Sequence, residues 1–240
     1  MTEPTTAPDA TRDRLTVLIA GGSSAAGTAA ARALSAAGHR VLSVGSDAGR
    51  IRAATEGIAG AVPLVCDLAD PAAVAALAED IHRDYGLIDG LVQLVGGWRG
   101  GKGLADQSDA DWDFLEHSVL TTLRNTTRTF LPDIAASPCG RLAVISSTSV
   151  TAPTPGNAAY AAIKAAAETW TFAAAAELDP ARGAAVVLVV KALVDAGMRA
   201  AAPDRKFSGY TDVDDLAGAL AGLFDARAEA INGARLELTS

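Results

Sequence analysis

Cysteine and aromatic residues are scarce in this chain of 240 residues. The two cysteines, Cys66 and Cys139, are spaced neither as a metal-binding pair nor as a CxxC motif, so we expect free thiols in a reducing compartment and no metal site. Aromatic side chains make up 5% of the residues, whereas apolar residues make up 50%. The core is therefore expected to be large and mainly aliphatic.

An excess of positive charge and long apolar runs are also absent. The formal net charge is -8 at pH 7, which argues against a nucleic-acid-binding surface. The longest purely apolar run, residues 184–190, is too short to span a bilayer, and the polar residues 1–13 lack the apolar core of an export signal. We therefore expect a flexible leader over 1–13, one domain over 14–240, and a cytoplasmic protein without membrane or nucleic-acid partners.

Strand-like and helix-like segments alternate along the chain. Strands are predicted over residues 15–20, 40–45, 61–66, 88–97, 141–147, 184–193 and 234–239, and helices over about 27–38, 71–86, 110–134, 157–178 and 213–225. Apolar strands that do not alternate are buried on both faces, and strands separated by helices form right-handed βαβ units. The pattern predicts an α/β fold, a doubly wound, Rossmann-like, parallel seven-stranded sheet with helices on both faces, and ligands at the carboxyl ends of the strands.

A glycine- and serine-rich turn follows the first predicted strand, in "LIAGGSSAAGTAAARAL" at residues 18–34. Small residues allow a pyrophosphate to approach the backbone, and the N-terminus of the following helix offers N–H groups and the positive end of its dipole. The alternative is a tight turn that binds no ligand and contains glycines only because side chains would not fit there. The position after the first strand of a βαβ pattern favours a nucleotide site.

Tyr160 and Lys164 lie four residues apart on a predicted helix and so share one of its faces. Ser147 ends the fifth predicted strand, thirteen residues before Tyr160. The alternative is a core tyrosine with a solvated lysine. The serine, the YxxxK pair and the glycine loop together resemble the short-chain dehydrogenase/reductase family, although Ala20 and Ala25 replace the leading threonine and the middle glycine of its TGxxxGxG loop.

The resemblance implies a nicotinamide-dependent reductase of a small carbonyl, imine or quinonoid compound. Its catalytic residues would be Ser147, which positions the substrate oxygen, Tyr160, which donates the proton, and Lys164, which lowers the pKa of Tyr160 and holds the ribose hydroxyls. The phenol of tyrosine otherwise titrates near about pH 10, so a nearby ammonium would favour the phenolate. The implied cofactor-binding residues are Gly21, Ser23, Ser24, Ala26, Gly27, Ser46, Asp67, Leu68, Gly96, Tyr160, Lys164 and Val194.

Several positions depart from the family pattern. Val119 stands where members have a helix asparagine, Lys191 and Ala192 replace a proline-glycine pair, and Ala196 replaces a threonine. These departures leave open a second hypothesis, a nucleotide-binding protein with impaired turnover that acts as a scaffold, sensor or helper subunit. The retained serine, tyrosine and lysine favour the enzyme.

The segment "LVGGWRGGKG", residues 94–103, is similar to a stretch of the dihydropteridine reductases. This similarity suggests that the chain lies near that subgroup and that Trp98 binds substrate beside Ser147 and Tyr160, since a flat aromatic ring can stack on a planar ligand. The alternative is a flexible loop at the edge of the sheet.

The end of the second predicted strand bears on the choice of cofactor. Gly45 stands where NAD-preferring proteins have an acidic residue, and Ser46 follows it, so NADP(H) is expected to bind better than NAD(H). Asp47 would reverse this preference if it turned inward. The alanine-rich helices near 110–134 and 157–178 suggest a homodimer or homotetramer.

Overall fold

Seven strands form one parallel sheet in the computed structural model, which describes residues 14–238; the expected leader over 1–13 lies outside the described residues. The strands are β1 (Thr16–Ala20), β2 (Arg40–Gly45), β3 (Ala61–Val65), β4 (Gly90–Gln93), β5 (Arg141–Ser147), β6 (Ala184–Val190) and β9 (Arg235–Glu237). Their order is β3-β2-β1-β4-β5-β6-β9. The chain builds outward in one direction from β1 and in the other from β4, which confirms the doubly wound fold.

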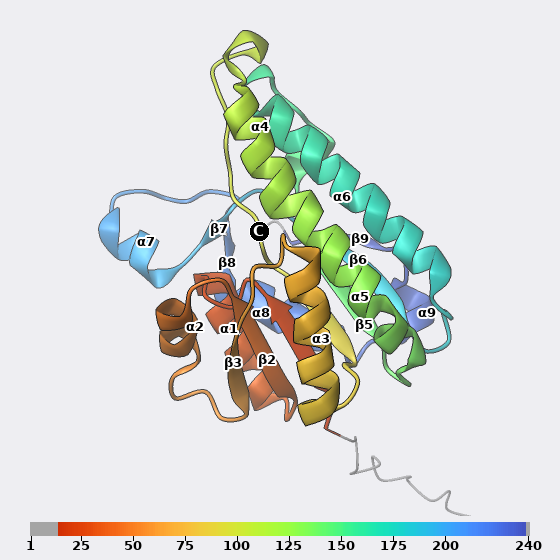
Figure 1. The fold of residues 1–240 in the computed structure, drawn as a ribbon. Coiled ribbons are helices and arrows are strands. Elements are labelled where there is room, and N and C mark those ends of the chain that lie inside the picture. Colours follow the sequence, from red (N-terminus) through yellow and green to blue (C-terminus); the bar gives the residue numbers. More distant parts are fainter. Residues whose placement is uncertain (1–13, 239–240) are drawn as a thin grey trace, which may run out of the picture.

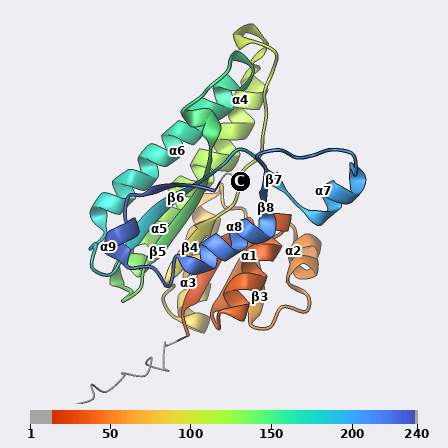
Figure 2. The ribbon, with the colours of Figure 1, turned by 180° about the vertical axis from the view of Figure 1, so that it is seen from behind.

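Helices cover both faces of the sheet, as predicted. They are α1 (Ala25–Ala36), α2 (Ala48–Thr55), α3 (Pro71–Tyr85), α4 (Asp109–Leu115), α5 (Thr122–Ala136), α6 (Ala158–Glu177), α7 (Ala196–Ala201), α8 (Val213–Gly222) and α9 (Ala228–Ile231). In β1, Val17 and Ile19 belong to the core cluster that includes α1 and α8, whereas Leu18 and Ala20 belong to the cluster with α3, α5 and α6. Figure 1 shows α3, α5 and α6 in front of the sheet. Figure 2, seen from the opposite side, shows α1 and α8 on the other face.

Side-chain caps fix where the first three helices begin. Ser24, Asp47 and Asp70 each accept a hydrogen bond from a backbone N–H in the first turn of α1, α2 and α3, respectively. Pro71 occupies the first helical position of α3, where a missing N–H costs nothing. The cap of α3 was expected from the sequence, and the cap of α1 places the helix start two residues before the predicted one.

Two strands end earlier than predicted. β4 stops at Gln93 rather than at residue 97, because the chain at Leu94 packs against the glycine loop: a Cβ atom on Gly21 would lie 2.9 Å from the carbonyl carbon of Leu94. β6 stops at Val190 rather than at residue 193, because the next residues leave the sheet and pair elsewhere. Both endings lie at the carboxyl edge, where ligands bind in such sheets.

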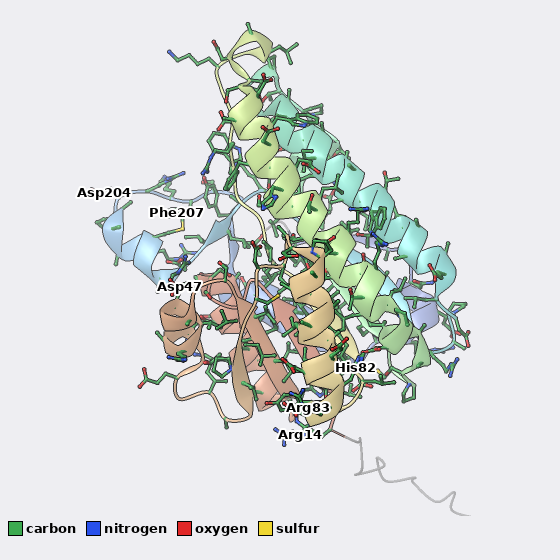
Figure 3. All side chains as sticks on the ribbon, in the orientation of Figure 1. Arg14, Asp47, His82, Arg83, Asp204 and Phe207 are labelled. Atoms are coloured by element: carbon green, nitrogen blue, oxygen red, sulfur yellow. The ribbon has the colours of Figure 1, made fainter. Side chains whose placement is uncertain are left out.

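The segment after β6 forms a projecting arm. β7 (Leu193–Val194) pairs with β8 (Thr211–Asp212) in a separate parallel ladder, and α7 lies between them. The arm extends away from the sheet in both ribbon views (Figures 1 and 2). Figure 3 labels Asp204 and Phe207 on it, and Asp47 at the start of α2 on the same side of the drawing.

The long helix predicted over 110–134 runs from α4 into α5 through a π-helical stretch, Glu116–Thr121. Such wide turns are uncommon and often occur at functional sites. Val119 lies within this stretch, and its side chain is buried. The wide turn therefore sets how Val119 faces the carboxyl edge of the sheet.

Both cysteines are free thiols, as expected, with Cys66 buried and Cys139 partly buried. Burial is the main cause that raises the pKa of Cys66, to about 11. Within residues 14–238, no helix combines the length and apolar character needed to cross a bilayer.

Arg141 begins β5 and is buried. Its guanidinium donates to the carbonyl oxygens of Leu223 at 2.7 Å and Ala226 at 2.7 Å, which follow α8. It also donates to the carbonyl oxygens of Gly140 at 2.8 Å and Arg182 at 3.0 Å. One cation thus satisfies four backbone acceptors and faces the negative end of the α8 dipole.

We predict that Arg141→Met lowers the free energy of unfolding by on the order of 3 kcal/mol, because buried carbonyl oxygens lose their donors. Urea unfolding at fixed protein concentration measures the change. Arg182→Met is the matched control, because that side chain is about half exposed and forms an ion pair with the equally exposed Asp179, three residues earlier. A similar loss in both variants would contradict the role of Arg141.

Candidate active site

The glycine loop is held against β2 and the start of α1. The backbone N–H groups of Gly21 and Gly22 both donate to the carbonyl oxygen of Val44, at 3.0 and 2.9 Å. The Ser24 hydroxyl accepts from the Gly27 N–H at 2.9 Å and donates to the Gly21 carbonyl oxygen at 2.9 Å. These bonds fix a tight turn at the N-terminus of α1, where an anion would meet backbone N–H groups.

Two features of this loop suit a nucleotide. A Cβ atom on Gly27 would lie 2.5 Å from the Gly21 carbonyl oxygen, so glycine is needed for the helix to pack on the turn. The Ser23 hydroxyl is buried and has no partner, although Ser23 lines the adjacent cavity with Gly21 and Ser24. A buried hydroxyl without a partner is costly, and a bound polar group would satisfy it.

The cavity beside the loop has a volume of about 440 Å³. It is lined by Ser46 and Asp47 after β2, by Asp67 and Leu68 after β3, and by Gly96. This set contains the expected adenosine-side residues, all at the carboxyl ends of parallel strands. Asp47 caps α2 by accepting from the Arg50 N–H at 2.7 Å, which occupies one of its carboxylate oxygens.

Three further residues support this cavity and were not identified from the sequence. Arg50 and His117 line it. The Asn125 side chain, from α5, donates to the carbonyl oxygens of Leu68 at 3.1 Å and Ala69 at 2.9 Å. It therefore holds the loop after β3 in place.

Ser147, Tyr160 and Lys164 line one neighbouring cavity with a volume of about 660 Å³. Ser147 is the last residue of β5, and the other two project from the first turns of α6. The structure therefore brings the three residues together, as the spacing predicted. Gly96 lines both cavities, so the two volumes meet beside it.

Tyr160 is partly buried, and this burial raises the pKa of its phenol; a hydrogen bond with the Ser147 hydroxyl partly offsets the rise. The pKa of Tyr160 is therefore raised, whereas the family resemblance implied that Lys164 would lower it. The Lys164 ammonium lies 5.9 Å from the centre of the Tyr160 ring and donates to the carbonyl oxygen of Ile145 at 2.8 Å instead. Tyr160 is therefore protonated at neutral pH and able to donate.

Lys164 is itself buried. Burial lowers the pKa of its ammonium from 10.5 to about 8, and the negative charge of Glu168, one helical turn away, opposes the shift. Val119 adds apolar surface here: a Cβ atom on Gly96 would lie 3.5 Å from the Val119 side chain and 3.9 Å from the Lys164 nitrogen. The valine that replaces the family asparagine thus lies near the lysine.

Glu168 joins α6 to two strands. Its buried carboxylate accepts from the Ser146 hydroxyl at 2.5 Å and pairs with the Arg235 guanidinium of β9 at 3.1 Å. Ser146 precedes Ser147 and follows Ile145, so the bonds made by Glu168 and Lys164 hold α6 against neighbouring residues of β5. This network was also not found from the sequence.

The remaining predicted residues lie around the second cavity. Ala26 and Trp98 line it, and the Trp98 side chain is 61% exposed at its mouth. Val194 is buried in β7, and its neighbour Leu193 lines the cavity. Contacts of these residues with cofactor or substrate stay predictions.

The parallel sheet, the glycine loop at its switch point and the Ser147, Tyr160 and Lys164 set have the arrangement of a Rossmann-fold oxidoreductase. A family model described as short chain dehydrogenase matches residues 15–206. The chain belongs to the short-chain dehydrogenase/reductase family.

Named relatives agree with this assignment. A short chain dehydrogenase of Pseudocercospora fijiensis is 29% identical over 184 residues, which are 73% of this chain and 60% of that protein. The 3-oxoacyl-(acyl-carrier-protein) reductase FabG of Salmonella typhimurium is 25% identical over 231 residues, 92% of this chain and 94% of that one. The chain thus spans less than two thirds of the fungal relative and nearly all of the bacterial one.

The fold also matches a solved gluconate 5-dehydrogenase from Burkholderia cenocepacia J2315 in complex with NADP and tartrate. The TM-score is 0.79 and the identity 27%, with 94% of each chain covered. These relatives support an oxidoreductase and a nicotinamide cofactor.

We predict that Lys164 makes stability depend on pH. Because its folded pKa is lowered to about 8, the unfolded chain binds more protons than the folded one between pH 8 and 10.5, and this group adds stability as pH rises through that window. The free energy of unfolding of the wild type should therefore rise relative to Lys164→Met, by on the order of 3 kcal/mol. Chemical unfolding of both proteins from pH 7 to 10 measures it, and a constant difference would contradict the burial of a charged amine.

Proposed function

We propose that the protein is an NAD(P)H-dependent reductase of a small carbonyl, imine or quinonoid substrate. The observation that carries the proposal is that Ser147, Tyr160 and Lys164 line one cavity that meets the glycine-loop cavity beside Gly96. A cofactor held by the loop would supply a hydride to the substrate carbon when bound.

Tyr160 would donate the proton to the substrate heteroatom. Its raised pKa keeps the phenol protonated, and its position beside Ser147 allows both hydroxyls to reach the same substrate oxygen. The Ser147 hydroxyl also accepts from the Ser149 N–H at 3.1 Å, which orients it at the end of β5. A serine in this role donates to the oxygen where negative charge develops.

Lys164 would hold the ribose of the cofactor and influence Tyr160 electrostatically. Its bond to the Ile145 carbonyl fixes the ammonium between α6 and β5, and its lowered pKa brings its proton exchange close to neutral pH. The alternative of a nucleotide-binding scaffold, sensor or helper subunit is less well supported, because such a protein has no need of the three side chains in one cavity.

Trp98 at the cavity mouth would contact a planar substrate, as the resemblance to the dihydropteridine reductases suggests. The protein is further proposed to be cytoplasmic and to form a homodimer or homotetramer through the long helices α5 and α6.

We predict that Tyr160→Phe lowers turnover about 10²–10⁴-fold, because the proton donor is lost. Cofactor affinity should stay unchanged, since the ring and Lys164 remain. The decrease in nicotinamide absorbance with a panel of ketones, quinones and quinonoid pterins measures turnover, and fluorescence titration measures binding. Tyr85→Phe, at the far end of α3, is the matched control. Near-wild-type turnover of Tyr160→Phe would overturn the assignment.

NADP(H) is proposed as the preferred cofactor. Gly45 offers no carboxylate to bind a ribose 2'-hydroxyl, and Asp47 is engaged as the cap of α2. Arg50 lines the same cavity as Ser46, and a guanidinium forms strong hydrogen bonds with phosphate oxygens.

We predict that Arg50→Gln weakens NADPH binding about tenfold and leaves NADH binding within about twofold, because only NADPH carries the 2'-phosphate. Titrations at one salt concentration are required, since a phosphate contact is screened. Arg52→Gln is the matched control, as Arg52 is exposed on the same helix and does not line the cavity. Tighter binding of NADH than of NADPH by the wild type would contradict the proposed preference for NADP(H).

A further inference from the structure

Lys191 lines the cavity of Ser147 and Tyr160, and after Lys164 it is the second lysine in that lining. It directly follows β6 and stands where the family has a proline. Among the described residues that line this cavity there is no aspartate or glutamate, although the whole chain carries a net charge of -8. Lys164 is buried and directed at the Ile145 carbonyl, whereas Lys191 is exposed. The accessible charge in the cavity is therefore that of Lys191.

The arm after β6 holds Lys191 in place. Its Nζ donates to the Ser208 carbonyl oxygen at 3.1 Å. Gly209 has a φ of 73°, and a Cβ atom there would lie 3.3 Å from the Lys191 Cδ and 3.5 Å from its Nζ. The Thr211 N–H donates to the Ala192 carbonyl oxygen at 2.9 Å, which ties the returning chain to the same place. The arm is thus shaped around the lysine, and an ammonium has three donors, so others remain for a ligand.

Neighbouring charges on the arm are engaged elsewhere. Arg199 pairs with Asp212 at 3.2 Å, and Arg205 donates to the Tyr210 hydroxyl at 2.7 Å. Asp195 caps α7 by accepting from the Met198 N–H at 2.7 Å. Within residues 14–238, no carboxylate forms an ion pair with Lys191. Its charge is therefore available to a molecule in the cavity.

We propose that Lys191 binds a carboxylate of the substrate, so that the protein acts on small carbonyl compounds that carry an acidic group. The proposal rests on the proposed reductase function and specifies its substrate class. The Trp98, Leu193 and Tyr210 side chains supply apolar surface around the same cavity, which suits the body of such a molecule. An ammonium–carboxylate hydrogen bond in a partly enclosed site is stronger than a neutral one.

Matched aldehydes test the proposal. The probes are 3- and 4-carboxybenzaldehyde and their methyl esters, which differ in charge at one position. We expect the wild type to reduce at least one acid about tenfold more efficiently than its ester in kcat/KM, mainly through KM. Lys191→Met should bring this acid-to-ester ratio close to one, and Lys191→Arg should retain most of it.

Lys206→Met is the control for net charge, because Lys206 is exposed on the arm and does not line the cavity; it should keep the wild-type ratio. The proposal is overturned if the wild type shows no preference for either acid, or if Lys191→Met keeps the ratio. It is also overturned if Lys191→Met weakens NADPH binding and affects acids and esters alike, because Lys191 would then belong to the cofactor site.

A binding measurement separates this proposal from the reductase function. Isothermal titration of 3- and 4-(hydroxymethyl)benzoate into the protein with oxidised cofactor needs no turnover. Loss of benzoate binding in Lys191→Met, without any aldehyde reduction by the wild type, would support the carboxylate site and refute the proposed reaction. Reduction of aldehydes with equal benzoate binding in both proteins would refute the carboxylate site alone.

Discussion

The attachment of α6 to β5 is the constraint on which the catalytic site depends. Lys164 donates to the Ile145 carbonyl oxygen at 2.8 Å, and Glu168 accepts from Ser146 at 2.5 Å, so two polar bonds join successive turns of the helix to successive residues of the strand. The Ser146–Glu168 bond is buried and the Lys164–Ile145 bond is partly buried, so losing either would leave a buried ionisable side chain with one hydrogen bond fewer. Because Tyr160 lies on α6 and Ser147 ends β5, these bonds also fix where the two hydroxyls meet.

Arg235, on β9 at the edge of the sheet, compensates the buried negative charge of Glu168 by forming an ion pair with it. A carboxylate buried between a helix and a sheet would otherwise raise the free energy of the folded state by several kcal/mol. The edge strand β9 therefore stabilises α6 through this ion pair, and in the sheet order it lies on the far side of β5 from β1 and the glycine loop. The loop side depends on hydrogen bonds to Val44 and through Ser24, and on close contacts at Gly21 and Gly27 that leave no room for a side chain.

Two departures from the family pattern, Val119 and Lys191, lie near the same site. Val119 places apolar surface near Lys164, which contributes to the burial that lowers the pKa of the ammonium. Lys191 adds an exposed cation to the lining of the cavity. One substitution therefore removes a polar group from beside the buried lysine, and the other adds a charge to the cavity lining.

The sequence by itself determined the seven-stranded sheet and the glycine loop, because periodicity and short motifs are local properties of a chain, and its resemblance to the family singled out Ser147, Tyr160 and Lys164 as candidates. Only the tertiary structure decided the direction of the Tyr160 pKa, since burial and the orientation of Lys164 depend on how α6 packs. It also decided the Ser146, Glu168 and Arg235 network, whose members come from three elements far apart in the chain. The position of Lys191 against Ser208 was decided in the same way, because the arm must fold back before its carbonyl oxygen reaches the ammonium.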